Sequence, residues 1–304
     1  MTTSHVSDED FLDNFLNLQQ APDGSAIVNN GDISIKDGGF ALLVAPQVVN
    51  NGTIIARFGK VGLGAGSKGT IDLYGDGLIQ FEPSSDVANL VNNGVIQGGY
   101  VELTAADVDA LLKGVVRVNG VIKADHVVIE GGENSIVRLN GSVTAKNEAQ
   151  QTGGRVDVLG DLVSLLENTD IDVSGELGGG QVHVGGDYQG KGILKTATTT
   201  YMAAGAEIDA SAVRMGDGGK VILWADETAH FEGQITATGG ADGGDGGFVE
   251  TSGKGQLAYR GSVDVTAKNG DIGSLLLDPE NITISSDPFT PTDLAGGVFW
   301  FDPS

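Results

Sequence analysis

The chain has 304 residues, of which 49 are glycine, and it carries a formal net charge of −24. This charge argues against binding of nucleic acid, which depends mainly on Lys and Arg contacts with phosphate, and against docking on anionic lipid. The absence of cysteine excludes disulfides. No apolar run reaches the roughly 18 residues of a membrane-spanning helix, so we predict no membrane insertion.

The first residues predict a short helix. The segment SDEDFLDNFLNL (7–18) places four apolar side chains at helical spacing behind Ser7, a suitable N-cap. We therefore assign 1–20 to an N-terminal cap. A basic stretch followed by an apolar run, which is typical of a signal peptide, does not occur there. If the protein is exported, we expect its leader to be missing from this sequence.

From residue 21 onward two short phrases alternate. The first is an apolar residue, one or two Asn, Gly, any residue and Ile or Val, as in VNNGDI (28–33), VNNGTI (49–54), VNNGVI (91–96), VNGVI (118–122) and LNGSV (139–143). The second is Gly-Gly-X-Val-X-Val, as in GGYVELTA (98–105), GGRVDVLG (153–160), GGQVHVGG (179–186), GGKVILWA (218–225) and GGFVETSG (246–253). Each phrase reads as a short strand with Gly or Asn at its corner, where positive φ is needed.

Repetition of this kind predicts a solenoid. One such unit cannot bury its own apolar face, whereas stacked units bury it against their neighbours. Parallel strands about 4.8 Å apart would then form sheets along the coil, with Val and Ile pointing inward. We predict an all-β chain with a parallel β-helix over 21–285, right-handed because crossover connections favour that hand.

Three stretches interrupt the pattern. TAADVDALLKGVV (104–116) predicts a second short helix that protrudes between coils, with Thr104 as its N-cap. ATTTYMAAG (197–205) is interpreted as a loop. The segment 278–297 concentrates proline and acidic residues, so we interpret 286–304 as the start of a following region or a tail.

The run GGADGGDGGF (239–248) is the most suggestive metal motif. Its alternation of Asp and Gly is typical of calcium-binding β-roll turns, in which carboxylates and carbonyls surround a hard cation. Asp242 and Asp245 are therefore calcium candidates, and Asp217 would join them only if neighbouring coils bring the two turns together. Because β-roll motifs occur in tandem and this one occurs once, we predict a turn without a cofactor and keep calcium as the alternative.

The two X positions of the Gly-Gly phrase should face outward. Asp157 and His183 occupy the same position in consecutive copies, so they could lie side by side as an acid–base pair on a polysaccharide lyase or hydrolase. The alternative is an ordinary solvated sheet face. No dense cluster of acidic and basic groups and no HExxH or GxSxG motif is present, so we predict that the protein is not an enzyme.

Outward aromatic residues could stack on sugar rings. Tyr100 and Phe248 stand in the outward column, and Trp224 lies in VILWADE. These three are our ligand-binding candidates. The alternative is that each ring covers a neighbouring loop or helix.

Longer stretches carry a resemblance to a known family. They are GGFALLVAPQVVNNGTIIARFGKVGLGAG (38–66), GTIDLYGDGLIQF (69–81), GDGGKVILWADETAHFEGQITATGG (216–240) and GSLLLDPENITI (273–284). These stretches resemble filamentous-haemagglutinin-type exoproteins, the passengers of bacterial two-partner secretion. The resemblance covers about residues 5–285. The family's secretion domain carries an Asn-Pro-Asn-Gly motif that is absent here, so no residue is assigned the contact that motif makes.

The resemblance implies a secreted or cell-surface adhesin segment with a right-handed β-helix. It implies a TpsB-type outer-membrane transporter as partner, with a carbohydrate or another surface receptor as a further partner in adhesion, aggregation or biofilm. Two alternatives stay open. One is a purely structural stalk of a contact-dependent toxin or haem-scavenging exoprotein, and the other is the polysaccharide lyase or hydrolase considered above.

Overall fold

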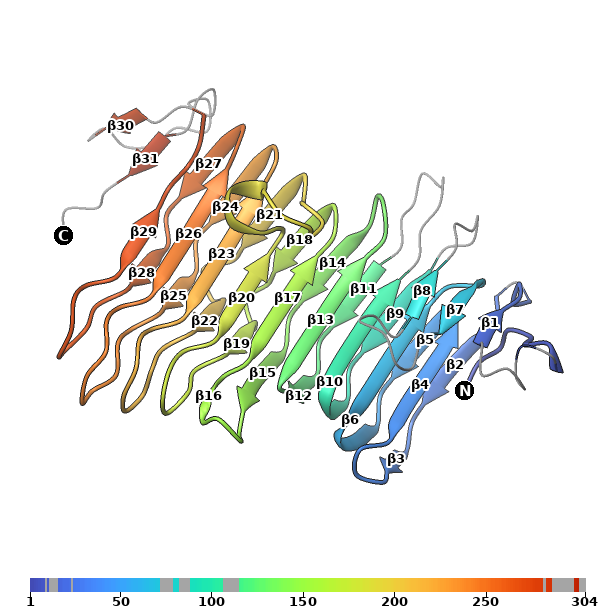
Figure 1. Ribbon diagram of the computed structural model, residues 1–304. Coiled ribbons are helices and arrows are strands. Elements are labelled where there is room, and N and C mark those ends of the chain that lie inside the picture. The colour runs from blue at the N-terminus through green and yellow to red at the C-terminus, as the bar shows by residue number, and fades with distance from the viewer. Residues whose placement is uncertain are drawn as a thin grey trace. The chain divides into compact units, whose positions relative to one another are not determined.

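The computed structural model describes residues 1–8, 10, 16–22, 24–71, 79–81, 88–105, 115–280, 283–285 and 298–300. The chain divides into two compact units, Met1–Gly141 and Ser142–Ser304. Each unit is a parallel β-helix, in which every coil adds strands to sheets that extend through the unit (Figure 1). The predicted all-β class and the parallel β-helix are confirmed.

In the unit Met1–Gly141 each coil has three sides. One side belongs to sheet C, formed by β2 (Ala26–Asn29), β5 (Gln47–Asn50), β9 (Asn89–Asn92), β11 (Val115–Val118) and β14 (Ile136–Leu139). The other two sides belong to sheet A, formed by β3 (Asp32–Ile35), β4 (Phe40–Ala45), β6 (Thr53–Ala65), β10 (Val95–Ala105), β12 (Val121–Ala124) and β13 (His126–Gly131). The long strands β6 and β10 run through both of these sides, because each pairs with a strand on either side of the bend.

The unit Ser142–Ser304 repeats this arrangement. Its part of sheet C contains β18 (Leu162–Leu165), β21 (Thr199–Met202), β24 (Thr228–Phe231), β27 (Gln256–Tyr259), β31 (Val298–Trp300) and β30 (Thr283–Ser285). Its part of sheet A contains β15 (Ser142–Asn147), β17 (Arg155–Leu159), β19 (Asp170–Asp172), β20 (Gln181–Val184), β22 (Glu207–Asp209), β23 (Lys220–Ala225), β25 (Gln234–Thr236), β26 (Phe248–Gly253), β28 (Ser262–Asp264) and β29 (Ser274–Leu276). A short strand, β16 (Thr152–Gly153), turns back antiparallel against β15.

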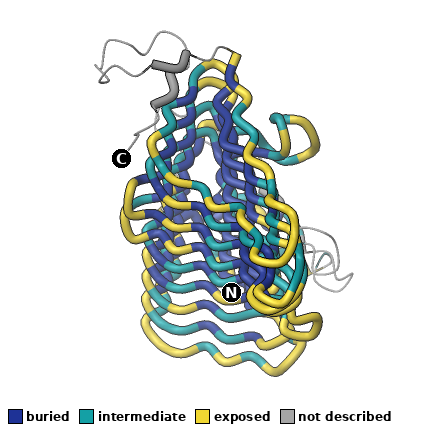
Figure 2. Tube along the Cα trace, turned by 90° about the vertical axis from the view of Figure 1, so that its left-hand side faces the viewer, coloured by how far each residue is buried: buried dark blue, intermediate teal, exposed yellow. Residues whose placement is uncertain are grey.

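The final Ile or Val of the Asn-Gly phrase points into the coil and pairs with its counterpart in the next coil, through Ile33, Ile54, Ile96 and Ile122 in the first unit. The second unit continues this column from Val143, the end of the last Asn-Gly phrase, to residues at the same position of later coils, Ile171, Ile208, Ile235 and Val263. Ile54, Ile122 and Ile235 are fully buried, and burying one such side chain stabilises the fold by about 1.5–3 kcal/mol. Figure 2 shows the buried residues along the inner walls and the exposed residues at the turns.

Two columns of asparagine side chains stabilise the corner after sheet C in the first unit. In the inner column, Asn29 Nδ2 donates to Asn50 Oδ1 and Asn50 Nδ2 donates to Asn92 Oδ1, both at 2.8 Å. Asn50 and Asn92 are fully buried. In the outer, exposed column, the side-chain Nδ2 of Asn51, Asn93 and Asn119 each donates to the asparagine one coil earlier. The repeated Asn-Asn-Gly therefore satisfies polar groups at a corner that the sheets leave unpaired.

The predicted helix at 7–18 is wrong at its C-terminal end. Leu16–Leu18 is strand β1, which pairs antiparallel with β7 (Gly69–Ile71), and β7 pairs with β8 (Ile79–Phe81) in a small sheet B. The N-cap prediction is supported, because Ser7 Oγ accepts a hydrogen bond from the Asp10 N–H at 3.0 Å. Residues 9 and 11–15 lie outside the described residues. Leu18 instead caps the first coil, where it packs in a buried cluster with Leu42, Val44 and Ile79.

Two further predictions need correction. Both ends of the helix expected at 104–116 are strand instead, because Thr104 lies in β10 and residues 115–116 lie in β11. Positions 106–114 are outside the described part. The loop expected at 197–205 contains strand β21, which pairs with β18 and β24. In both places the parallel pairing of the coil outweighs the local preference of the sequence. No helix in the described residues is long and apolar enough to cross a membrane.

Within 286–304 the structure describes β31, which pairs parallel with β27 and with β30. Sheet C therefore extends into the segment interpreted as a tail.

Candidate functional site

A strap covers part of the outer face of sheet A in the second unit. The strap, Gly185–Thr198, leaves the coil after β20 and returns at β21, and it carries the short 3-10 turn η1 (Tyr188–Gly190). Gly190 has φ +60°, and a Cβ there would lie 2.5 Å from the Trp224 ring. Glycine is required at this position because the backbone of the strap rests directly on the indole.

The strap changes the character of the outward column. Asp157, His183, Ile222 and Glu250 pair in register along successive strands, as the repeat predicts. All four are buried, and Trp224 is only 4% exposed. The expectation of a solvated face is therefore wrong here, and Trp224 is not available to a ligand. Its ring packs under the strap, and its Nε1 donates to Asp226 Oδ1 at 3.0 Å.

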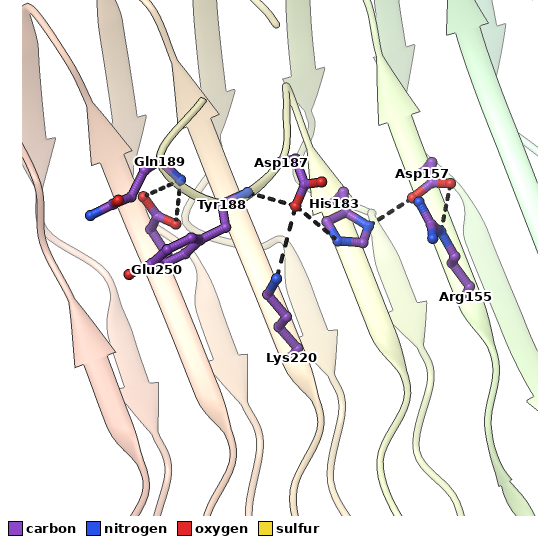
Figure 3. A network of polar contacts seen from close by, with 8 residues as sticks. All are labelled: Arg155, Asp157, His183, Asp187, Tyr188, Gln189, Lys220 and Glu250. Carbon is purple, nitrogen blue, oxygen red and sulfur yellow. Dashed lines mark hydrogen bonds and ion pairs between the residues drawn. The ribbon is translucent and has the colours of Figure 1, made fainter. Parts of the chain in front are cut away.

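The predicted acid–base pair forms, but inside a closed polar network (Figure 3). His183 Nδ1 lies 2.8 Å from Asp157 Oδ1, and Arg155 Nε donates to both Asp157 oxygens at 3.0 and 2.9 Å. Asp187, on the strap, lies between His183 Nε2 at 3.9 Å and Lys220 Nζ at 3.8 Å. The side chains of Asp157 and His183 are each 4% exposed. A general base must reach the proton that it removes, so this geometry favours a structural role for the pair.

Glu250 holds the strap to the sheet. Both of its carboxylate oxygens accept from the backbone N–H of Gln189, at 3.2 and 3.1 Å, and Gln189 adopts a positive φ of 55° there. Burial raises the pKa of Glu250 above its ordinary value, whereas the Gln189 hydrogen bond acts to lower it. A buried carboxylate that accepts these bonds fixes the turn of η1 in place.

A groove runs across the second unit beside the strap. It has a volume of about 740 Å³ and crosses four coils at the same point of the Gly-Gly phrase. We call it the glycine groove, because Gly-Gly pairs or a single Gly form its floor in each coil. In three of these coils an Asp precedes the glycines along the chain, and we call this side, formed by Asp217, Asp245 and Asp271, the acidic wall. Gln181, Lys220, Phe248 and Ser274 follow the glycines, and Tyr188 of the strap also lines the groove.

The acidic wall is an ordered column. Asp217 Oδ1 accepts from the Asp245 N–H, and Asp245 Oδ1 accepts from the Asp271 N–H, both at 2.8 Å. Neighbouring coils therefore do bring the Asp217 and Asp245 turns together. Asp242 is exposed in the adjoining loop, where its N–H donates to Arg214 O. No group of three or more acidic, His or Cys side chains that could hold a metal is found among the residues that the structure describes.

The other two aromatic candidates are not isolated platforms. Tyr100, in the first unit, donates its hydroxyl to Glu102 Oε2 at 3.1 Å and meets His126 edge-on at 5.2 Å between ring centroids. Phe248 lies edge-on against Tyr188 at 5.7 Å. Tyr188 was missed by sequence reasoning, because it lies in the strap rather than in a repeated phrase. The residue is 40% exposed, which makes it the more accessible of this pair.

Comparisons with solved structures give a match that covers most of the chain. No family model matches the sequence, and no curated protein matches it. Among solved structures, the HMW1 secretion domain from Haemophilus influenzae matches with a TM-score of 0.75 and 29% sequence identity. The chain is similar to a secretion domain. The match covers 91% of this chain and 73% of that one, so the likeness extends over both β-helical units.

Proposed function

We propose that this chain is a segment of a secreted exoprotein of the filamentous-haemagglutinin type, exported by two-partner secretion. The observation that carries the proposal is the match to the HMW1 secretion domain over 91% of the chain at a TM-score of 0.75. The partner in export is a TpsB-type outer-membrane transporter. The exported protein is then secreted or held at the cell surface.

The architecture suits passage through a pore as an unfolded chain. Strands pair with their counterparts in the next coil, so each new coil can fold on the one before it. The chain has no cysteine that could form a disulfide before export is complete. Stepwise folding outside the cell would draw the chain forward, since each added coil buries apolar side chains that were exposed.

The role after export is adhesion to a surface, a matrix or another cell. The open glycine groove supports this role over that of a stalk without ligands, which would need only the stacked coils. No catalytic activity is expected, because Asp157 and His183 lie under the strap. Calcium at Asp242 and Asp245 remains the alternative for the acidic turns.

The export proposal is tested by placing the chain behind a cleavable export leader and expressing it with a TpsB-type transporter from the same genome. We expect folded, protease-resistant chain in the medium only when the transporter is present. A transporter with an inactivated periplasmic region serves as the control. Because the Asn-Pro-Asn-Gly motif is absent from this sequence, the test is repeated with a motif-bearing segment of a related secretion domain fused ahead of the chain. Chain that stays in the periplasm in both forms with the intact transporter would overturn the proposal.

A further inference from the structure

We propose that the glycine groove binds a linear glycan that carries free amino groups. The amines would contact the column of Asp217, Asp245 and Asp271, and one sugar ring would stack on Tyr188. This inference concerns a binding site and its ligand class, and it does not depend on the route by which the protein is exported.

The spacing of the coils along the groove is close to the spacing of residues in a linear glycan. The groove crosses four consecutive coils, and parallel strands lie about 4.8 Å apart. This spacing is close to the length of one pyranose residue in an extended glycan. A chain of sugars lying along the groove would therefore meet Asp217, Asp245 and Asp271 in three successive coils, which favours a repeating ligand over a compact one.

The acidic wall presents an unused carboxylate oxygen in three of the four coils. Oδ1 of Asp217 and of Asp245 accepts a backbone N–H of the next coil, and the Oδ2 atoms have no hydrogen-bond partner among the described residues. All three carboxylates are exposed. The stacked turns hold the groups in a row before any ligand arrives, which reduces the entropy cost of binding.

The opposite side supplies a stacking ring. Tyr188 is held by Phe248 on one side, and Lys220 Nζ lies 5.5 Å from its ring centroid. Tyr188 N–H donates to the Asp187 carboxylate at 2.7 Å, which fixes the turn that carries the ring. Because Lys220 Nζ lies over one face of the ring, a sugar would place its C–H side against the other face, and the hydroxyl tip of the tyrosine would stay in water.

The charge of the groove selects the class of glycan. Its lining includes three carboxylates and one ammonium group, Lys220, which already lies 3.8 Å from Asp187. The groove is therefore net negative in a protein whose net charge is −24. Acidic polysaccharides would be repelled, whereas protonated amines at sugar spacing would pair with the aspartates.

Two other ligands fit less well. An extended peptide would need free backbone groups, but Gly219, Gly247 and Gly273 already donate their N–H groups to carbonyls within the coils. A metal ion would need converging ligands. The three carboxylates instead lie one per coil along a line, and the described residues contain no metal-binding group of three.

The test is calorimetric titration of the purified chain with glucosamine oligomers of two, four and six residues. Fully N-acetylated oligomers of equal length serve as the uncharged comparison, and polylysine as a cation without sugar rings. We expect saturable binding of the amine form, tightening at least tenfold from dimer to tetramer. The affinity for polylysine should be the same for the wild type and for a Tyr188→Ala variant.

Two sets of variants locate the site. Asp217→Asn, Asp245→Asn and Asp271→Asn together keep the Oδ1 acceptors that hold the turns, yet remove the charges, and should weaken binding at least tenfold. Tyr188→Ala should weaken the binding of glucosamine oligomers at least tenfold and leave the binding of polylysine unchanged. The matched control changes three exposed acids of the first unit, Asp32→Asn, Asp37→Asn and Glu133→Gln, and should leave binding within twofold of the wild type.

The possible outcomes separate cleanly. Loss of binding in the groove variants with retention in the control supports the site. Equal loss in both sets, equal affinity for dimer and hexamer, or no binding by any glucosamine oligomer would overturn the proposal. Tighter binding of the N-acetylated form would also overturn it, because that result would assign recognition to the rings and not to the aspartates.

Discussion

The two units differ in the side chains that fill the corner after sheet C. The last residue of each sheet C strand in Met1–Gly141 begins as a column of amides and ends as an apolar one, in the order Asn29, Asn50, Asn92, Val118 and Leu139. In Ser142–Ser304 that position holds a column of increasingly large apolar side chains, in the order Leu165, Met202, Phe231 and Tyr259.

The difference shows that the same corner position accepts an amide or an apolar side chain, provided that its neighbours satisfy its contacts. A buried asparagine is tolerated when its amide is satisfied. Asn50 bonds to asparagines of the coils beside it, whereas Asn92, which pairs with Val118 of the next coil, donates to Gly94 O. A buried phenylalanine needs apolar side chains at the same position of the adjacent coils. Phe231 and Tyr259 meet with ring centroids 5.0 Å apart, whereas Asn50 has hydrogen bonds to the asparagines above and below it.

The largest expected effect tests the apolar column. Phe231→Ala removes a fully buried ring and should lower the free energy of unfolding by about 3–5 kcal/mol. Urea unfolding followed by tryptophan fluorescence reports on the second unit, where both tryptophans lie. Phe231→Leu, which keeps much of the volume, should cost less than half as much. An equal loss of unfolding free energy in Phe231→Ala and Phe231→Leu would show that the volume kept by leucine does not stabilise the column.

The amide column should respond almost as strongly. Asn50→Ala leaves the amides of Asn29 and Asn92 without their partner and should cost about 2–4 kcal/mol, because buried polar groups become unsatisfied. The adjacent Asn51→Ala breaks the exposed column, where water replaces the lost bonds, and should cost less than about 1 kcal/mol. Urea midpoints from circular dichroism measure both. A similar cost for the two variants would contradict the distinction between inner and outer columns.

The strap has no counterpart described in the first unit, and its seating can be tested alone. Gly190→Ala drives a methyl group into the Trp224 ring at a positive φ and should cost about 1–3 kcal/mol. It should also change the Trp224 emission and speed tryptic cleavage at Lys191 and Lys195. Gly178→Ala is the matched control: it has φ +152°, but its Cβ would meet nothing nearer than 3.9 Å. Unchanged emission in Gly190→Ala would show that the strap is not packed on the indole.

The smallest effect concerns the pH dependence of the strap. Burial raises the pKa of Glu250 above its ordinary value of 4.5. Its contribution to stability is therefore complete below pH 4.5 and is lost as the pH rises through the folded-state pKa. Glu250→Gln removes this titration while keeping an acceptor for Gln189. The variant should gain stability relative to the wild type as the pH rises from about 4.5 to 8.

Glu250→Ala is the companion variant for this measurement. It removes the acceptor as well as the charge, so it should be less stable than Glu250→Gln at every pH. Unfolding curves in urea at several pH values measure all three proteins. Parallel curves for the wild type and Glu250→Gln would mean that the carboxylate does not titrate differently in the folded protein.

The repeated phrases made the coil predictable, because strands with a period of two must place Ile54, Ile122 and Ile235 on the inner face once the turns are fixed. The pairing of Asp157 with His183 followed from the same register. What the phrases could not show is which of two adjacent asparagines points inward. Asn50 and Asn51 have the same side chain, and the backbone alone decides which one is buried.

The strap could not be predicted for a related reason. Its residues, GGDYQGKGILKTAT, have the same glycine-rich composition as the turns, so they read as one more connection. The available signal was a longer interval before the next Gly-Gly phrase. The burial of Glu250 and Trp224 depends on contacts with Gln189 and Gly190, far along the chain. A pattern based on neighbouring residues has no access to such contacts.

The asparagine corner also has a direction. In the inner column each amide donates toward the later coil, and Asn92 ends it by donating to Gly94 O at 3.4 Å. In the outer column Asn51, Asn93 and Asn119 donate toward the earlier coil. The corner is thus two strings of aligned amide dipoles with opposite polarity. Over the coils that hold both columns their fields oppose each other, unlike the summed dipole of an α-helix, so this edge accumulates little net dipole along the coil axis.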